Sequence, residues 1–334
     1  MRVDSANAGA RSWRTGEPRR VLVTGGCGFV GAHVVADLCR AGHAVTVLDN
    51  EAAGERAALA GLPAAFRAGD VRDAAALEAV VPGQDAVVHL AAAPDLAGAL
   101  RDPVHGMDVN VRGSLCVLEA ARRHGVAQVL AASSGGTVLG DRARPVHAEG
   151  VPAPRSPLGA SKLAMEGYLS AYARSFGLAA CSLRLANVYG PGCTHKTSVV
   201  AEFMRDIAGG RRPVLHGDGR QARDFVYVRD VAAGIRRALE AGATGTYQLG
   251  SGAPTTIRAL LEAIAEVAGR PVPWPEYAPA RVGEVRTTYC DIAAARADFG
   301  FDPATPLPAG LARTWAWLVG DAPAHERMMG AALR

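Results

Sequence analysis

The stretch VLVTGGCGFVGAHVVADLCRAGH, from Val21 to His43, decides the fold of this chain. Its first residues are a short β-branched run, typical of a buried strand, that ends at a cluster of glycines. Apolar residues then recur at helical spacing until Gly42, a common signal for the end of a helix. A strand, a glycine turn and a helix in this order predict the first unit of a parallel sheet covered by helices.

The turn has glycines at every third position, Gly25, Gly28 and Gly31. Glycine allows a sharp turn and lets a pyrophosphate approach the helix N-terminus, whose dipole favours negative charge. This spacing is also common in purely structural turns. Asp49 adds weight, because it ends the second predicted strand about 20 residues later, where a carboxylate can bind the hydroxyls of an adenosine ribose. A 2′-phosphate would be repelled there, so we predict NAD rather than NADP.

Strand-like and helix-like segments continue to alternate after His43. Such alternation implies a parallel sheet with helices on both faces. We therefore predict an α/β protein with a Rossmann-like, doubly wound parallel sheet in residues 20–186, the NAD-binding domain. Residues 187–330 contain looser Gly- and Pro-rich pieces and are expected to form mainly a smaller C-terminal substrate-binding domain, although a strand near 246–250 is expected to join the sheet. Residues 1–19 carry arginines and no apolar segment, so we expect a disordered N-terminal arm rather than a signal peptide.

Composition excludes several classes of function. The formal net charge of +4 is small for 334 residues, and no basic stripe with interleaved aromatic residues indicates nucleic acid. No window is long and apolar enough to suggest a transmembrane helix. The six cysteines are scattered, with neither a C-x-x-C pair nor a neighbouring histidine cluster, so we expect no metal site and a reducing, cytoplasmic location.

Several segments, in a fixed order, are similar to the motifs of one enzyme family. They are TGGCGFVG (24–31), AGDVRD (68–73), VVHLAAAPD (87–95), DVNVRGSLCVLEAAR (108–122), SSGGTVLG (133–140), LRLANVYGPG (183–192), GDGRQARDFVYVRDVA (217–232) and ARVGEVRTTYCDI (280–292). From Val21 to about Trp317 the chain resembles the extended short-chain dehydrogenase/reductase family. The likeness is strongest to its NAD-dependent nucleotide-sugar epimerases and dehydratases of the UDP-glucose 4-epimerase kind.

The resemblance implies a cofactor site and a substrate site. The residues implied to bind NAD are Gly25, Gly28, Phe29, Val30, Gly31, Asp49, Asn50, Asp70, Val71, Leu90, Ala91, Ala92, Asn110 and Lys162. A nucleoside-diphosphate sugar, with a UDP-sugar favoured, is implied to bind Ser134, Asn187, Val214, Leu215, Arg223 and Arg281. The two arginines suit a diphosphate because a guanidinium donates paired hydrogen bonds. The resemblance also implies a homodimer formed through helices of the first domain.

The family's Tyr-x-x-x-Lys pattern is incomplete in this chain. Lys162 is present, but Leu158 occupies the position of the tyrosine. Residues i and i+4 share a helix face, so the ammonium normally lies near the phenol and favours its ionised form, which takes a proton from a sugar hydroxyl. Leucine cannot move a proton.

Three interpretations remain open. Another group, such as Ser134, Thr137, Cys193 or His195, acts as the base; or water or the substrate carries the proton; or the chain binds NAD and a nucleotide sugar without turnover. We favour an enzyme whose active site contains Ser134, Thr137 and Lys162.

The type of reaction is indicated by the segment after the active-site hydroxyl. Dehydratases of the family carry an acidic pair there, whereas this chain has Gly136 and Thr137. We therefore predict epimerisation through a transient keto sugar and NADH. The alternatives are an NAD(H)-dependent sugar-nucleotide reductase or dehydratase, and a non-catalytic protein that binds NAD and a nucleotide sugar.

Overall fold

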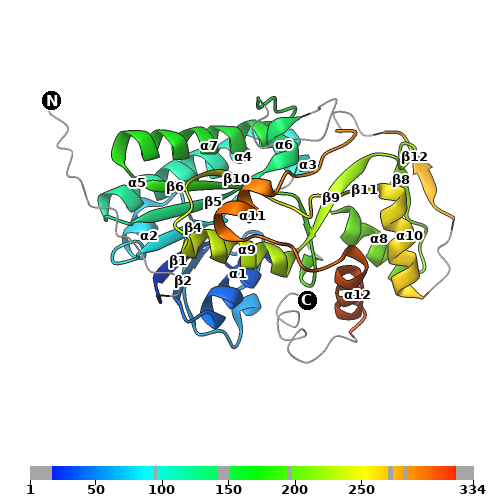
Figure 1. Ribbon diagram of the computed structural model, residues 1–334, viewed down its shortest axis with the longest axis horizontal. Helices are drawn as coiled ribbons and strands as arrows, with labels where there is room; N and C mark the ends of the chain where they lie inside the picture. The colour runs from blue at the N-terminus through cyan, green and yellow to red at the C-terminus, as the bar shows by residue number, and fades with distance from the viewer. Residues whose placement is uncertain are drawn as a thin grey trace.

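A computed structural model describes residues 17–93, 96–140, 151–193, 198–269, 274–280 and 285–320. Its centre is a seven-stranded parallel sheet with the strand order β10-β6-β5-β4-β1-β2-β3 (Figure 1). The strands are β1 (Arg20–Thr24), β2 (Ala44–Asp49), β3 (Ala64–Ala68), β4 (Ala86–His89), β5 (Gln128–Ser134), β6 (Ala179–Leu185) and β10 (Gly245–Leu249). The predicted α/β, Rossmann-like fold is confirmed.

Helices cover both faces of the sheet. One face carries α1 (Phe29–Arg40) and α9 (Val228–Glu240); the other carries α2 (Ala74–Glu78), α5 (Gly113–Arg123) and α7 (Pro157–Phe176) (Figure 1). The strands are apolar on both sides because each face is covered, which explains their continuous β-branched runs.

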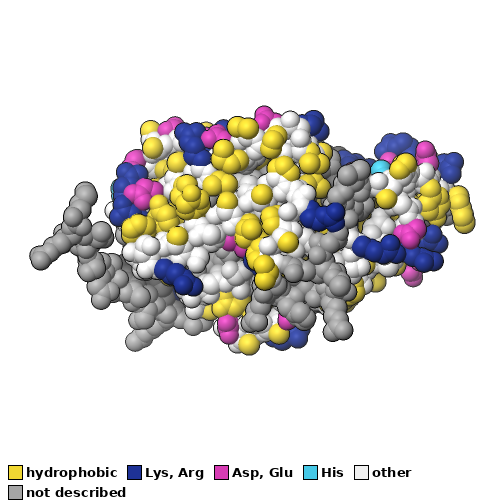
Figure 2. All heavy atoms as spheres, turned by 90° about the horizontal axis from the view of Figure 1, so that it is seen from above, with side chains coloured by type: hydrophobic (Ala, Val, Ile, Leu, Met, Phe, Trp, Pro, Cys, Tyr) yellow, Lys and Arg dark blue, Asp and Glu magenta, His cyan; other side chains and the backbone are white. Residues whose placement is uncertain are grey.

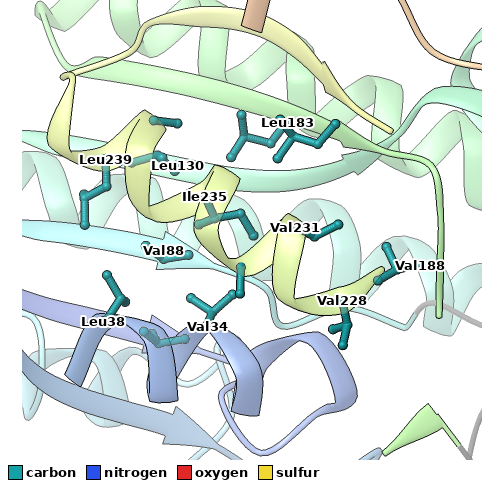
Figure 3. Packing of buried hydrophobic residues seen from close by; sticks show 14 of the residues in the cluster. Val34, Leu38, Val88, Leu130, Leu183, Val188, Val228, Val231, Ile235 and Leu239 are labelled. Carbon is teal, nitrogen blue, oxygen red and sulfur yellow. The ribbon is translucent and has the colours of Figure 1, made fainter. Parts of the chain in front are cut away.

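The core under α1 and α9 shows how the two helices cover one face. Val34 and Leu38 of α1 point toward α9 (Figure 3). Val88, Leu130 and Leu183 of the sheet belong to the same hydrophobic layer (Figure 3). The α9 side chains in this layer are Val228, Val231, Ile235 and Leu239 (Figure 3). This packing places the start of α1, and with it the glycine turn, at the carboxyl end of the sheet.

The N-terminal boundary differs from the prediction. Arg19, which was expected to lie in a disordered arm, is only 2% exposed and donates hydrogen bonds to the carbonyl oxygens of Leu239 (2.6 Å) and Glu240 (3.1 Å). The last carbonyls of a helix have no partner within the helix. The Leu239 oxygen also accepts from the backbone nitrogen of Gly242 at 3.1 Å, and the buried guanidinium adds a hydrogen bond to each of the two carbonyls. Arg19 therefore belongs to the folded core, and the part of the arm before residue 17 lies outside the described residues.

The second part of the chain forms smaller sheets with their own core. Strands β7 (Asn187–Tyr189), β9 (Ala222–Tyr227) and β11 (Pro254–Thr256) form one sheet, and β8 (Val214–His216) pairs with β12 (Glu276–Ala278). Helices α8 (Val199–Ala208), α10 (Ile257–Ala268) and α12 (Leu307–Leu318) pack around a separate hydrophobic cluster. The strand expected near 246–250 is β10, which pairs with β6 at the edge of the main sheet.

The remaining described elements are short. They are a 3-10 turn (Arg56–Leu59), α3 (Leu96–Arg101), α4 (Pro103–Met107), a π-helical turn (Asp108–Arg112), α6 (Gly135–Leu139) and α11 (Ala293–Phe299). Among the helices that the structure describes, none is long and apolar enough to cross a membrane.

Candidate cofactor and substrate site

The glycine turn after β1 is packed so closely that side chains are excluded. Gly25 has a φ of +73°, and a Cβ atom there would lie 2.5 Å from the backbone nitrogen of Ala91. A Cβ atom on Gly31 would overlap the carbonyl oxygen of Gly25. Gly28 precedes α1 and supplies no capping side chain, so the helix N-terminus keeps its affinity for an anion. These features fit a pyrophosphate that approaches the backbone.

Asp49 is held beside this turn at the end of β2. Its carboxylate accepts hydrogen bonds from the backbone nitrogens of Cys27 (2.9 Å) and Glu51 (2.7 Å). Burial raises the pKa of Asp49, while these two hydrogen bonds act in the opposite direction. Each carboxylate oxygen has a further lone pair that a ribose hydroxyl can use. The residues present therefore fit the adenosine ribose of NAD.

Asp49 sets the first testable prediction, which concerns cofactor choice. We expect NAD to bind at least about tenfold (about 1.4 kcal/mol) more tightly than NADP, because a 2′-phosphate would meet a buried carboxylate. Asp49→Asn should narrow this preference in calorimetric titrations. Asp73→Asn is the matched control, since it removes the same charge at the start of α2 and keeps a capping side chain. Equal affinity of the wild-type protein for NAD and NADP would contradict the assignment.

Asp70 and Asn50 lie together at the neighbouring strand end. The Asn50 amide donates to Asp70 at 2.9 Å, and Arg72 bonds both oxygens of Asp70 at 2.8 and 2.9 Å. The Arg72 guanidinium holds the pKa of Asp70 well below its usual range. Asn50 and Arg72 thus fix the carboxylate of Asp70, and the adjacent Val71 is buried in the core.

The loop after β4 contacts the glycine turn from the other side. The backbone nitrogen of Leu90 donates to the carbonyl oxygen of Thr24 at 2.9 Å, and Ala91 is the residue that excludes a side chain at Gly25. Of the residues predicted along NAD, the structure thus brings Leu90, Ala91, Asp49 and the glycines to one end of the sheet. Ala92 follows in the same loop.

Asn110 lies in the π-helical turn and joins this loop to α7. Its side chain accepts from the backbone nitrogen of Ala93 (2.8 Å) and donates to the hydroxyl of Ser161 (2.9 Å). Ser161 in turn donates to the carbonyl oxygen of Leu158 at 2.8 Å. Asn110 is buried and its amide is used by these contacts, so it fixes the first turn of α7 relative to the cofactor loop.

Lys162 lies on α7, which begins at Pro157 after the capping residue Ser156. The residue is 8% exposed, and the Nζ atom donates to the carbonyl oxygen of Ala132 at 2.9 Å. Burial lowers the pKa of Lys162 to about 8, although the charge of Glu166 opposes this shift. The amino group therefore lies near the carboxyl end of β5, where burial makes its protonated form less stable than in water.

The two predicted hydroxyls come from the junction of β5 and α6. Ser134 is the last residue of β5 and makes no capping hydrogen bond to α6. The Thr137 Oγ1 atom is buried and has no hydrogen-bond partner in the part of the chain that the structure describes. The backbone of Thr137 packs directly on α7, because a Cβ atom on Gly159 would overlap the Thr137 carbonyl oxygen. The structure thus brings Thr137 next to the helix that carries Leu158 and Lys162.

The other proposed bases are less suited to the task. Cys193 is 2% exposed within the hydrophobic core, where a thiolate would be desolvated. His195 lies outside the described residues.

The phenol position itself is filled by a core residue. Leu158 is buried, with 6% exposure, and Leu139 is fully buried, so both leucines pack as core residues.

Two substrate motifs lie side by side although about 60 residues separate them. Residues 286–288 run along β9: the nitrogen of Ala222 donates to Arg286 at 2.8 Å, and that of Thr288 donates to Ala222 at 3.1 Å. Arg223 is half-buried on β9 and donates to the carbonyl oxygen of Ala222 at 2.9 Å. Arg281 precedes this segment but lies outside the described residues.

The two apolar residues predicted to bind the substrate, Val214 and Leu215, differ in burial. Val214 is 38% exposed on β8, whereas the side chain of Leu215 is 1% exposed and belongs to the hydrophobic cluster of the second part of the chain. Successive residues of a strand point to opposite faces, so only one of the two side chains can face a ligand. Asn187 is exposed at the start of β7.

Sequence reasoning missed Asp224, which organises the substrate segments. Its buried carboxylate accepts four hydrogen bonds, from Ser251 N (2.7 Å), Ser251 Oγ (2.7 Å), Gly252 N (3.0 Å) and Cys290 N (3.0 Å). The sequence predicted a substrate-binding role for its neighbour Arg223 and none for Asp224. Its position beside Arg223 gave no signal of a role in holding three chain segments together.

Comparisons with known proteins agree with this geometry. Residues 21–250 match the model of the NAD dependent epimerase/dehydratase family. A UDP-glucose 4-epimerase of Mycolicibacterium smegmatis is 36% identical over 304 residues, 88% of this chain and 97% of the relative. A dTDP-glucose 4,6-dehydratase of Mycobacterium tuberculosis is 38% identical over 242 residues, 70% of this chain and 72% of the relative. The solved UDP-glucose 4-epimerase of Thermotoga maritima with UDP-glucose has a TM-score of 0.86 and 34% identity, covering 90% of this chain and 99% of that one.

The family match covers the glycine turn, Asp49 and the whole of α7. The match therefore spans the elements that shape the cofactor site as well as most of the main sheet. The resemblance seen in the sequence is confirmed: the chain belongs to the NAD-dependent epimerase/dehydratase family, and NAD is its cofactor.

Proposed function

We propose that this protein epimerises a nucleoside-diphosphate sugar, with a UDP-sugar favoured, by means of bound NAD. The proposal rests on the sequence of α6, GGTVL. This helix follows the end of β5, contains Gly136 and Thr137, and has no acidic residue. Elimination of water needs a group that protonates the leaving hydroxyl, whereas epimerisation needs one proton removed from and returned to the same oxygen. The UDP-glucose 4-epimerases among the relatives support the same choice.

Bound NAD supplies the hydride acceptor and, later, the hydride donor at the sugar carbon that is inverted. The chain itself must position the sugar and move the proton of its hydroxyl. We assign the contact with that hydroxyl to Thr137, with Ser134 beside it. The Thr137 hydroxyl is buried and has no hydrogen-bond partner among the described residues. An unsatisfied buried hydroxyl costs about 1–3 kcal/mol, which a substrate hydroxyl would recover.

The proposal is tested with purified protein, NAD and a panel of UDP-, dTDP- and GDP-sugars. We expect one UDP-sugar to be converted to its epimer without net consumption of NAD, as measured by chromatography of the sugars and NADH absorbance. Stoichiometric oxidation or reduction would indicate the reductase alternative, and a dehydrated product the dehydratase.

Arg223→Ala tests the proposed contact with the diphosphate in the same assay. If this guanidinium binds the diphosphate, its loss weakens UDP-sugar binding by about 1.5–3 kcal/mol, the scale of hydrogen bonds to charged groups. NAD affinity should hardly change, since Arg223 lies on β9, outside the sheet that carries the glycine turn. Loss of NAD binding with unchanged sugar-nucleotide affinity would show that Arg223 is structural.

A non-catalytic binding protein is the second candidate, and Leu158 is the observation that favours it. The residue is a buried hydrocarbon at the position where the family carries a phenol. This candidate predicts that the wild-type protein binds NAD and a UDP-sugar but converts none of the panel.

A homodimer and a cytoplasmic location are parts of the same proposal. Hydrophobic side chains occur on the face that carries α7 (Figure 2). The exposed ones on α3, α4 and α7 are Leu96, Leu100, Val104, Met107, Tyr168 and Phe176. Such a surface supports association through helices of the first part of the chain.

All six cysteines are free thiols, which supports a reducing compartment.

A further inference from the structure

His89, the last residue of β4, lies at the centre of a buried chain of hydrogen bonds. Its Nδ1 atom is 2.7 Å from the Thr24 hydroxyl, and its Nε2 atom is 2.9 Å from the Ser114 hydroxyl. Ser114 donates to the carbonyl oxygen of Asn110 at 2.6 Å. All four residues are buried, so the chain connects β1, β4 and the start of α5 inside the protein.

The directions of these bonds determine the tautomer of the ring. A serine hydroxyl has one proton, and Ser114 gives it to Asn110, so the Ser114 oxygen can only accept from His89. The Nε2 atom of His89 therefore carries a proton. Burial lowers the pKa of His89 to about 3, so the ring is neutral and its Nδ1 atom accepts from Thr24. A single arrangement of protons satisfies all three side chains.

The two ends of this chain hold the two ends of the cofactor loop, residues 90–93. At one end, the Thr24 hydroxyl accepts from the backbone nitrogen of Ala91 at 3.4 Å. At the other end, the Asn110 amide accepts from the nitrogen of Ala93 at 2.8 Å and donates to its carbonyl oxygen at 3.3 Å. Because Ala91 packs against the glycine turn, a shift of either end changes the cofactor site.

Asn110 also carries the chain to α7. Its amide donates to the Ser161 hydroxyl at 2.9 Å, and Ser161 donates to the carbonyl oxygen of Leu158 at 2.8 Å, one turn before Lys162. The charge of Lys162 acts on the pKa of His89 in the same direction as burial. Asn110 itself lies in a π-helical turn, an irregularity that is frequent at functional sites. The imidazole thus connects the cofactor loop with the helix that carries the active-site lysine.

We propose that His89 is a positioning residue for NAD, which as the neutral Nε2–H tautomer holds the cofactor loop and the first turn of α7 in one arrangement. A neutral imidazole suits this task because it donates at one nitrogen and accepts at the other. The inference rests on NAD as the cofactor and does not depend on which reaction the protein performs.

His89→Asn and His89→Gln each keep one side of the ring's hydrogen bonding. The amide of asparagine reaches the place of Nδ1 and can accept from Thr24, but it is too short to reach Ser114. The amide of glutamine reaches the place of Nε2 and can donate to Ser114, but it offers Thr24 no acceptor there. Each variant therefore frees a different end of the cofactor loop.

We expect both variants to bind NAD about 3- to 10-fold more weakly in calorimetric titrations, the effect of losing one hydrogen bond. Hydrogen exchange of the folded protein without NAD should show which end is loosened. The Ala93 amide should exchange faster in His89→Asn, and the Ala91 amide in His89→Gln. Ser114→Ala breaks the same link as His89→Asn and should reproduce its results. It leaves the ring in place, so it tests the link even where a ring variant fails to fold.

His43→Asn is the matched control. His43 is also buried, and its Nδ1 atom accepts from the backbone nitrogen of Arg19 at 3.1 Å. It directly precedes β2 and so lies at the amino end of the sheet, opposite the glycine turn. This variant should lower the stability of the protein without changing NAD affinity or the exchange of the Ala91 and Ala93 amides.

The tautomer of His89 is read from the ¹⁵N spectrum of protein labelled at histidine, with His89→Gln to assign the signal. We expect a proton on Nε2 and none on Nδ1 near neutral pH. A charged ring, or a proton on Nδ1, would contradict the directions of the hydrogen bonds and with them the inference.

The outcomes also separate a positioning role from a merely structural one. NAD affinity equal to wild type in His89→Asn, His89→Gln and Ser114→Ala would overturn the inference. Equal acceleration of both loop amides in every variant would overturn it as well, because a general loss of stability acts on the whole loop. A protein that binds NAD but converts no sugar would refute the proposed epimerisation and leave the role of His89 intact.

Discussion

Glu166→Ala is expected to lower the free energy of unfolding by about 3–5 kcal/mol, the usual cost of removing one partner of a buried ion pair. The side chains of Glu166 and Arg184 are 7% and 6% exposed, so the substitution leaves a guanidinium charge in the core without its carboxylate. It also removes the acceptor of the Ser133 hydroxyl. Urea denaturation followed by circular dichroism measures the loss.

Two control variants show whether burial causes the effect. Asp302→Ala removes an exposed partner of Arg296 and should change the free energy of unfolding by less than about 1 kcal/mol. The double variant Glu166→Leu/Arg184→Met removes both buried charges and should be less destabilised than Glu166→Ala, because no charge is left unpaired. A Glu166→Ala variant as stable as Asp302→Ala would mean that Arg184 reaches water.

This ion pair is a feature that the sequence alone did not predict. Glu166 and Arg184 lie on α7 and β6, 18 residues apart, and no local pattern connects them. Local patterns did predict the glycine turn, the alternation of strands and helices, and the parallel sheet, because these depend on periodicity and on backbone conformation. The pairing of Glu166 depends instead on which strand lies under α7, which only the assembled sheet determines.

The substrate region was harder to predict for a similar reason. Leu215 and Val214 are equivalent in a hydrophobic pattern, but a strand of three residues is too short to show which side faces the core. Arg19 precedes the first strand in a polar segment, and nothing local indicates that it caps the distant end of α9. Residues that satisfy backbone groups far away in the chain, such as Arg19 and Asp224, carry no sequence signal of their own.

Introducing tyrosine at residue 158 (Leu158→Tyr) is expected to raise the turnover of the UDP-sugar by a factor of about 10² or more. A phenol at this position lies one helical turn from Lys162, on the same face of α7. The lysine ammonium then favours the ionised phenol, which accepts the proton of the sugar hydroxyl.

The substitution has a structural cost that must be separated from its chemistry. Leu158 is 6% exposed, so a larger ring is forced into a packed site and should destabilise the protein by about 1–3 kcal/mol. Leu158→Phe has the same ring without the hydroxyl and is the matched control. It should show a similar loss of stability and no gain in turnover.

The comparison of these two variants, measured with NAD and the UDP-sugar, isolates the effect of the phenol hydroxyl. A gain with tyrosine and not with phenylalanine would show that the site of the wild-type protein lacks an efficient proton acceptor at residue 158. No gain with tyrosine, in a protein that still binds NAD and the sugar, would contradict the assignment of residue 158 to the phenol position, because Lys162 one turn away would then have no phenol to stabilise.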